Sequence, residues 1–158
     1  MPHQVELHFF SENHAKDLDY ILSEEQLAFV KPPAFALNRA QGKKGEEFSL
    51  TILFNEKPVG FLALDFSNDK LALCDNKNAV LLRSLSINPK FQGKGIAKTA
   101  MLQVRDFVKN HFPTCDEIIL SVNTRNKSAY QLYIRSRFTD TGRIVLLTEE
   151  EFVLTSII

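Results

Sequence analysis

Apolar residues recur at three- and four-residue steps over residues 94–111, on one face formed by Ala97, Ala100, Met101, Val104, Phe107, Val108 and His111. This spacing is typical of an amphipathic helix packed against a core. Pro113 marks the end of that helix, because proline cannot continue the backbone hydrogen bonds. Residues 127–135 predict a second, shorter helix, which the Asn126 side chain can cap.

Short apolar runs bounded by polar breaks predict seven strands. They are Val5–Phe10, Phe48–Phe54, Pro58–Phe66, Ala79–Ile87, Glu117–Val122 and, approximately, residues 138–147 and 150–157. The turn Asn55-Glu56-Lys57 between two of these runs indicates a β-hairpin.

The first 47 residues give weaker patterns. Residues 14–21 and 23–30 predict two short helices, the second with Ser23 and Gln26 as a capping box. Lys31-Pro32-Pro33 stops any helix there, and the polar residues 38–47 predict a mobile loop. The resulting order of elements predicts one α/β domain over residues 1–158, in which about four helices flank a central mixed sheet of about seven strands.

Charge is balanced overall but not along the chain. The 19 Lys and Arg residues equal the 19 Asp and Glu residues, which argues against a general nucleic-acid-binding surface. Residues 1–78 hold 8 basic and 12 acidic side chains, whereas residues 79–111 hold 6 basic and 1 acidic. The basic middle of the chain indicates a local anion site.

Two cysteines are too few for a disulfide framework, and no apolar run reaches the roughly 18–20 residues that cross a bilayer. The chain also does not begin with the basic-then-apolar order of a signal peptide. We therefore expect a cytoplasmic protein. The four histidines are too scattered to indicate a metal site.

The clearest local motif is the turn Gln92-Gly93-Lys94-Gly95-Ile96-Ala97, between a predicted strand and the helix of residues 94–111. Free N–H groups at a helix start attract an anion, and glycines let a phosphate approach the backbone closely. Position 98 is Lys98 rather than the glycine that a nucleotide P-loop or a dinucleotide fingerprint needs there. The alternative is that the glycines only make a tight strand–helix turn.

Two motifs resemble those of the GNAT superfamily of N-acetyltransferases. Gln-x-x-Gly-x-Ala at Gln92–Ala97, after Leu85-Ser86-Ile87-Asn88-Pro89, is similar to that family's acetyl-CoA motif. Asn126-Lys127-Ser128-Ala129-Tyr130-Gln131-Leu132-Tyr133 looks like its second motif, Asn-x-x-Ala-x-x-Leu-Tyr. The likeness covers most of residues 48–138, while residues 1–47 match nothing specific.

The resemblance implies that two neighbouring strands splay apart and that the pantetheine arm of acetyl-CoA lies between them. Backbone groups of Leu85 and Ile87 would pair with its amides, amides from Gly93 to Lys98 would hold the pyrophosphate, and Asn126 would bond the arm. The implied cofactor-binding residues are Leu85, Ser86, Ile87, Gln92, Gly93, Lys94, Gly95, Ile96, Ala97, Lys98, Asn126, Ala129 and Tyr133.

The implied chemistry is direct attack of an amine on the thioester, with no protein nucleophile. A backbone N–H near Ile87 would stabilise the oxyanion, and Tyr133 would protonate the departing thiolate. Relatives that acetylate protein N-termini often carry a glutamate where this chain has Ser121. Asp65 is then a candidate base that would act through a water molecule. The alternative is that Asp65 is only a turn residue at the end of its strand.

The sequence leaves three functions open. The first is an N-acetyltransferase for a small amine (a polyamine or an aminoglycoside) or a peptide amine. The second is a non-catalytic acyl-CoA-binding sensor, and the third is an interaction domain on the same fold. The net acidic charge of residues 1–78 favours a cationic acceptor. The chain is expected to be a monomer or a homodimer. We expect neither nucleic acid nor a membrane as a partner.

Overall fold

A computed structural model of the chain describes residues 4–158. Its centre is a seven-stranded mixed sheet in the order β1-β2-β3-β4-β5-β7-β6, with β4 and β5 parallel and all other neighbours antiparallel. The strands are β1 (Val5–Phe9), β2 (Glu47–Phe54), β3 (Lys57–Asp65), β4 (Ala79–Ile87), β5 (Glu117–Asn123), β6 (Thr139–Leu146) and β7 (Glu150–Ile157). The predicted mixed sheet of about seven strands is confirmed.

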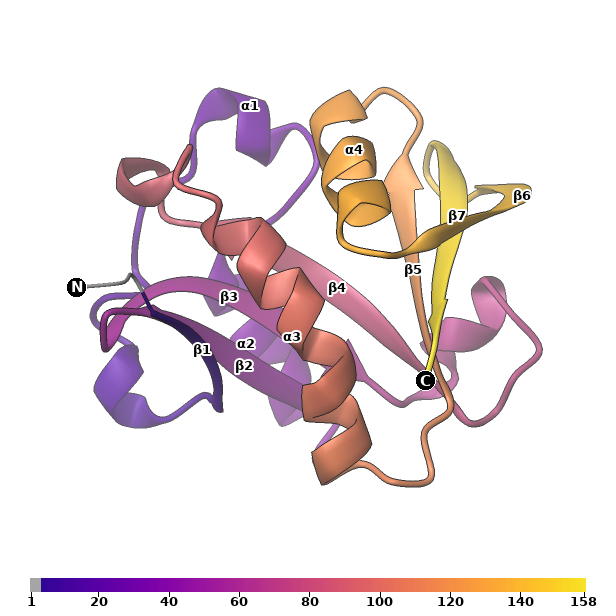
Figure 1. Ribbon diagram of the computed structural model, residues 1–158, viewed down its shortest axis with the longest axis horizontal. Helices are drawn as coiled ribbons and strands as arrows, with labels where there is room; N and C mark the ends of the chain where they lie inside the picture. Colours follow the sequence, from indigo (N-terminus) through magenta and orange to yellow (C-terminus); the bar gives the residue numbers. More distant parts are fainter. Residues whose placement is uncertain (1–3) are drawn as a thin grey trace.

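Helices cover both faces of this sheet (Figure 1). The helices α3 (Ile96–His111) and α4 (Lys127–Arg135) pack on one face, over a core that includes Leu82, Ile118, Leu120 and Val122. On the opposite face, α2 (Pro33–Gln41) contacts β2, β3 and β4. The hairpin between β2 and β3 turns at Asn55 and Glu56, which both have positive φ angles.

The N-terminal region differs from the prediction. Residues 12–14 form a short 3-10 helix (η1, Glu12–His14) in place of the predicted helix 14–21, and α1 spans only Glu24–Leu27. The loop predicted over residues 38–47 is only partly correct, because α2 runs to Gln41 and β2 begins at Glu47, which leaves residues 42–46 as the turn between them. Pro33 starts this helix rather than preventing it, since the first helical position needs no N–H donor and suits the fixed φ of proline.

The two parallel strands diverge along their length. β4 and β5 pair only through Ala79 with Glu117, Val80 with Ile118 and Leu81 with Ile119. Beyond these pairs, Ser84 has a φ of +63° at a register shift between β3 and β4. A bulge of this kind bends the strand and increases its twist. The C-terminal half of β4 therefore leaves the ladder with β5, which opens a V-shaped gap in the middle of the sheet.

Two more 3-10 helices complete the described chain. η2 (Asn68–Ala72) lies between β3 and β4, and η3 (Pro89–Phe91) lies between β4 and α3. η2 contacts β4, and Leu73, directly after it, packs with Leu81, Ile119 and Val153. These contacts place η2 on the face of the sheet opposite α3 and α4.

Candidate active site

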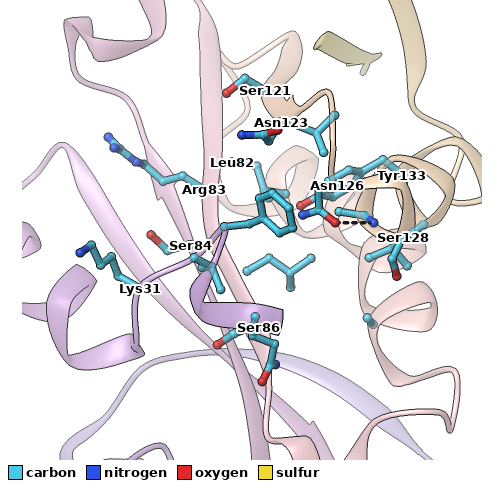
Figure 2. A pocket seen from close by; sticks show the side chains of 18 of the residues that line it. Lys31, Leu82, Arg83, Ser84, Ser86, Ser121, Asn123, Asn126, Ser128 and Tyr133 are labelled. Atoms are coloured by element: carbon cyan, nitrogen blue, oxygen red, sulfur yellow. Dashed lines mark hydrogen bonds between the residues drawn. The ribbon is translucent and has the colours of Figure 1, made fainter. Parts of the chain in front are cut away.

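A cavity of about 1400 Å³ occupies the V-shaped gap between β4 and β5. It is lined by side chains from α1, β4, the start of α3, β5, α4 and the turn between β6 and β7. Figure 2 shows part of this lining, with Ser84 and Ser86 on β4, Ser121 and Asn123 on β5, and Tyr133 on α4. Of the residues predicted to bind cofactor, all except the exposed Lys94 line this one cavity.

The glycine turn places an uncapped helix start at one end of the cavity. Gly93 and Gly95 have φ angles of +79° and +76°, so both positions favour glycine. The N-cap of α3 is Gly95, which has no side chain to cap the helix, whereas Ser23 caps α1 and Asn126 caps α4. An atom added at the Cβ position of Gly95 would meet nothing within 4 Å. This open space beside free amides fits a phosphate group.

Helix α1 reaches over β4 and engages the backbone expected to bind pantetheine. The Nε2 atom of Gln26 donates a hydrogen bond of 2.9 Å to the Ile87 carbonyl, and the Tyr20 hydroxyl lies 2.6 Å from the Ser86 Oγ. On the other side of the cavity, the Arg125 guanidinium lies over the Phe29 ring. The Ile87 carbonyl therefore already accepts one hydrogen bond from Gln26, and its second lone pair can accept another from a ligand.

Tyr133 lies in the cavity wall with 8% of its surface exposed. Within the described part of the chain, no hydrogen bond to its hydroxyl is found, and desolvation raises the pKa of this phenol above its usual range. A raised pKa keeps the hydroxyl protonated at neutral pH. The Tyr133 hydroxyl can therefore donate a hydrogen bond or a proton to a group in the cavity, although its raised pKa makes it a weaker acid than an exposed tyrosine.

The end of α4 fixes the position of the Tyr133 ring. The Phe138 N–H donates to the Tyr133 carbonyl at 3.0 Å and the Arg137 N–H to the Ile134 carbonyl at 3.3 Å. This is the Schellman arrangement, with Arg137 in the left-handed region at a φ of +71°. The Phe138 ring packs edge-on against Tyr133. Arg137 therefore holds a left-handed backbone conformation that costs strain for a residue with a Cβ.

Away from the glycine turn, both carboxylates and cations line the cavity. Asp69, Glu149 and Glu151 line it, together with Arg83 and Arg125. The Ser121 hydroxyl donates to the Glu151 Oε1 atom at 2.7 Å, and the Asn123 side chain donates to the Glu149 Oε2 atom at 2.7 Å. Sequence reasoning did not single out these glutamates. Only strand pairing brings residues 30 positions apart into contact.

Asp65 does not have the position expected of a base. Its side chain is fully buried, does not line the cavity, and contacts Lys43 Nζ at 2.9 Å and Arg83 at 3.2 Å. Burial alone would raise the pKa of this carboxyl, but hydrogen bonds from Ser67 and Lys43 outweigh it and lower the pKa to about 2. The hypothesis of Asp65 as the base is therefore wrong, because this carboxylate is already neutralised by two cations.

Among residues 4–158, no group of three or more His, Cys, Asp or Glu side chains is arranged to hold a metal ion, and His3 lies outside these residues. None of the helices in the same range combines the length and the apolar content needed to span a membrane.

Comparison with known proteins identifies the family. The sequence model described as the acetyltransferase (GNAT) family matches residues 15–137. The uncharacterized N-acetyltransferase YbbJ of Bacillus subtilis (strain 168) is 39% identical over 145 residues, which cover 90% of each chain. This chain therefore belongs to the GNAT family of acetyltransferases, whose members use acetyl-CoA, and the resemblance inferred from its motifs is confirmed.

Solved structures share the fold. The aminoglycoside acetyltransferase AAC(6')-Ib in complex with coenzyme A superposes with a TM-score of 0.77 at 15% identity, covering 98% of this chain and 95% of the other. The spermidine N-acetyltransferase of Vibrio cholerae in complex with coenzyme A and spermine gives a TM-score of 0.64 at 16% identity, covering 98% and 95%. The seven-stranded sheet with four helices is thus the GNAT fold.

Proposed function

We propose that this acetyltransferase transfers the acetyl group of acetyl-CoA to a primary amine of a small cationic molecule, such as a polyamine or an aminoglycoside. One observation carries the proposal: a single cavity connects the uncapped start of α3 with a region where the carboxylates Asp69, Glu149 and Glu151 line the wall. Opposite ends suit opposite charges, an anionic cofactor at one and a cationic acceptor at the other. Peptide amines are the alternative acceptors.

The cofactor end supports specific roles. Amides from Gly93 to Lys98 would bind the pyrophosphate, with the Lys98 side chain adding positive charge. The Asn126 Oδ1 atom accepts from the Ala129 N–H at 3.2 Å, which leaves its Nδ2 group to donate to a carbonyl of the pantetheine arm. Backbone groups at Leu85 and Ile87 would pair with the amides of the same arm.

The reaction needs an acid for the leaving group. Attack of the amine on the thioester carbon forms the new C–N bond, and collapse of the tetrahedral adduct breaks the C–S bond. Tyr133 would donate its proton to the departing thiolate, and its place in the cavity wall supports that role. A backbone N–H near Ile87 would stabilise the oxyanion.

The proposal is tested by measuring thiol release from acetyl-CoA with a panel of amines that includes spermine, spermidine, kanamycin and a short peptide. We expect acetyl-CoA to bind in calorimetry and thiol release to be fastest with a small polycation. Fastest release with the peptide would contradict the small-cation acceptor. Acetyl-CoA binding without thiol release on any amine would contradict the transfer reaction itself and favour a sensor.

A further inference from the structure

The three carboxylates that line the cavity away from the glycine turn differ in what they already contact. Asp69 contacts both Lys43 and Arg83, and Glu149 contacts Arg125 and Asn123. These contacts lower the pKa of Asp69, mainly through Lys43, and the pKa of Glu149, mainly through Asn123. Both carboxylates are held as anions whose charge is already compensated.

Glu151 is different. Its Oε1 atom accepts the Ser121 hydroxyl at 2.7 Å, and within residues 4–158 its Oε2 atom has no hydrogen-bond partner and no cation within 4.0 Å. The charged side chains around it on other elements have other partners. Arg143 on β6 donates to the Leu73 carbonyl, and Asp69, Arg83, Arg125 and Glu149 have the contacts given above. Of the other cations in the cavity wall, Arg39 contacts Glu47 and Lys31 lies over the Phe35 ring. Glu151 therefore has an oxygen free to meet an ammonium group.

Glu151 and Tyr133 lie on opposite faces of the sheet, and the alternation of side chains along β5 and β7 shows which face Glu151 takes. Ser121 is two residues beyond Ile119, and Glu151 is two residues before Val153, which belong to the small core on the η2 face. Tyr133 packs with Leu120 and Val122 on the α3–α4 face. Figure 2 shows Ser121 and Tyr133 at separate places in the lining. A thioester in the gap would lie between them.

From this arrangement we infer that Glu151, positioned by Ser121, is the general base that deprotonates the acceptor ammonium. The inference rests on the proposed function. An alkylammonium with a pKa near 10.4 leaves only about one molecule in a thousand as free amine near neutral pH, so a base is needed. The amine enters from the face of Glu151, and the thiol leaves on the face of Tyr133.

The protons balance in this scheme. The ammonium gives one proton to the Glu151 carboxylate, and the free amine attacks the thioester carbon. Collapse of the adduct releases the thiolate, which takes the proton of Tyr133, and the phenolate is restored by the second proton of the attacking nitrogen. The products are the amide, the free thiol and one proton, which Glu151 returns to solvent.

The test compares wild type with Glu151→Gln in thiol release, with spermine as the first amine probe and then the fastest amine of the screen. Removing a general base should lower kcat/KM at pH 7 by about 100-fold or more, mostly in kcat. Only neutral amine then reacts, so the rate of the variant should rise about tenfold per pH unit between pH 7 and 9. The wild-type profile should be flatter.

The matched control is Glu150→Gln, an exposed neighbour that does not line the cavity, which should remain within about twofold of wild type. Calorimetry with acetyl-CoA should give the same affinity for all three proteins, which shows that they are folded. Equal turnover of Glu151→Gln and wild type would overturn the inference alone. A higher KM with unchanged kcat and pH slope would also overturn it, because it indicates ammonium binding only. No thiol release by wild type with any amine would overturn the proposed function as well.

Discussion

At the scale of single residues, the surroundings of a side chain decide what chemistry it can perform. Tyr133 and Tyr130 lie on the same helix, but Tyr130 donates its hydroxyl to Asp140 at 2.9 Å and does not line the cavity. Tyr133 has no such partner within the described chain and faces the cavity. Tyr133 is therefore the candidate acid, and Tyr130 on the same helix is a matched control.

We expect Tyr133→Phe to lower kcat by about 100-fold or more, because the thiolate would leave without a proton donor. The phenylalanine keeps the packing against Phe138, so the affinity for acetyl-CoA should change little. Steady-state assays of thiol release measure kcat, and calorimetry measures the affinity for acetyl-CoA. Tyr130→Phe should leave kcat nearly unchanged. Full activity of Tyr133→Phe would remove the proposed acid.

At the scale of elements, the glycine turn before α3 and the turn after α4 use the same left-handed backbone conformation with different residues. Gly95 at φ +76° adopts it without strain, while Arg137 at φ +71° adopts it at a steric cost. The first turn leaves the α3 amides open, and the second closes α4 beneath Tyr133. Both turns therefore shape the cavity through the backbone.

Replacing Gly95 by alanine should cost about 1 kcal/mol of stability and weaken acetyl-CoA binding by about tenfold or more. The added Cβ strains the backbone and occupies the space beside the free amides. Gly45→Ala is the matched control, since Gly45 has a φ of +81°, also meets nothing within 4 Å, and does not line the cavity. Urea unfolding should show similar losses for both, and calorimetry a binding defect for Gly95→Ala alone.

Arg137→Gly should stabilise the protein by about 0.5–1 kcal/mol. Glycine relieves the strain at this position of the Schellman turn, and part of the gain is lost to the greater freedom of glycine in the unfolded chain. The midpoint of urea unfolding measures the effect. A lower midpoint would show that contacts of the arginine side chain outweigh the backbone strain.

At the scale of the whole molecule, buried ion pairs connect α2 to the sheet next to the cavity. Arg39 binds the buried Glu47 through two nitrogens at 2.9 and 2.8 Å and also donates to Ser84 at the bulge. Lys43 and Arg83 meet at Asp65. These contacts join residues far apart in the chain and hold β4 in the shape that separates it from β5.

Asp65 should make the stability of the fold depend on acid pH. Its pKa is about 2 in the folded protein and near 3.9 in an unfolded chain, so its stabilisation is complete above about pH 4 and is lost as the pH falls towards 2. Asp65→Asn should lower the free energy of unfolding by on the order of 2 kcal/mol at pH 6, with the difference vanishing near pH 2. Urea unfolding at several pH values measures this.

The same variant also tests the assignment of the base. Because Asp65 lies outside the cavity, Asp65→Asn should retain most of its acetyl transfer at neutral pH, whereas Glu151→Gln should not. A loss of activity in Asp65→Asn as large as in Glu151→Gln, with acetyl-CoA binding intact, would return the role of base to Asp65.

The sequence by itself determined what depends on local physics. The periodicity of α3 and α4, the apolar strands, the Ser23 capping box and the glycine turn are all set by residues within a few positions of one another. They predicted the family, the sheet and the part of the cavity lining around the glycine turn and α4. The α2 helix was missed although its signal, a proline at the first helical position, was present.

Only the tertiary structure decided which carboxylate is neutralised and which one remains free. The contacts of Asp65 with Lys43 and of Glu151 with Ser121 span 22 and 30 residues, and strand order and register create them. In the sequence, Asp65 and Glu151 are simply two carboxylate residues, and nothing near either one in the chain shows which is neutralised. Burial beside two cations makes Asp65 a structural anion, whereas pairing of β5 with β7 leaves Glu151 facing the cavity with an oxygen free.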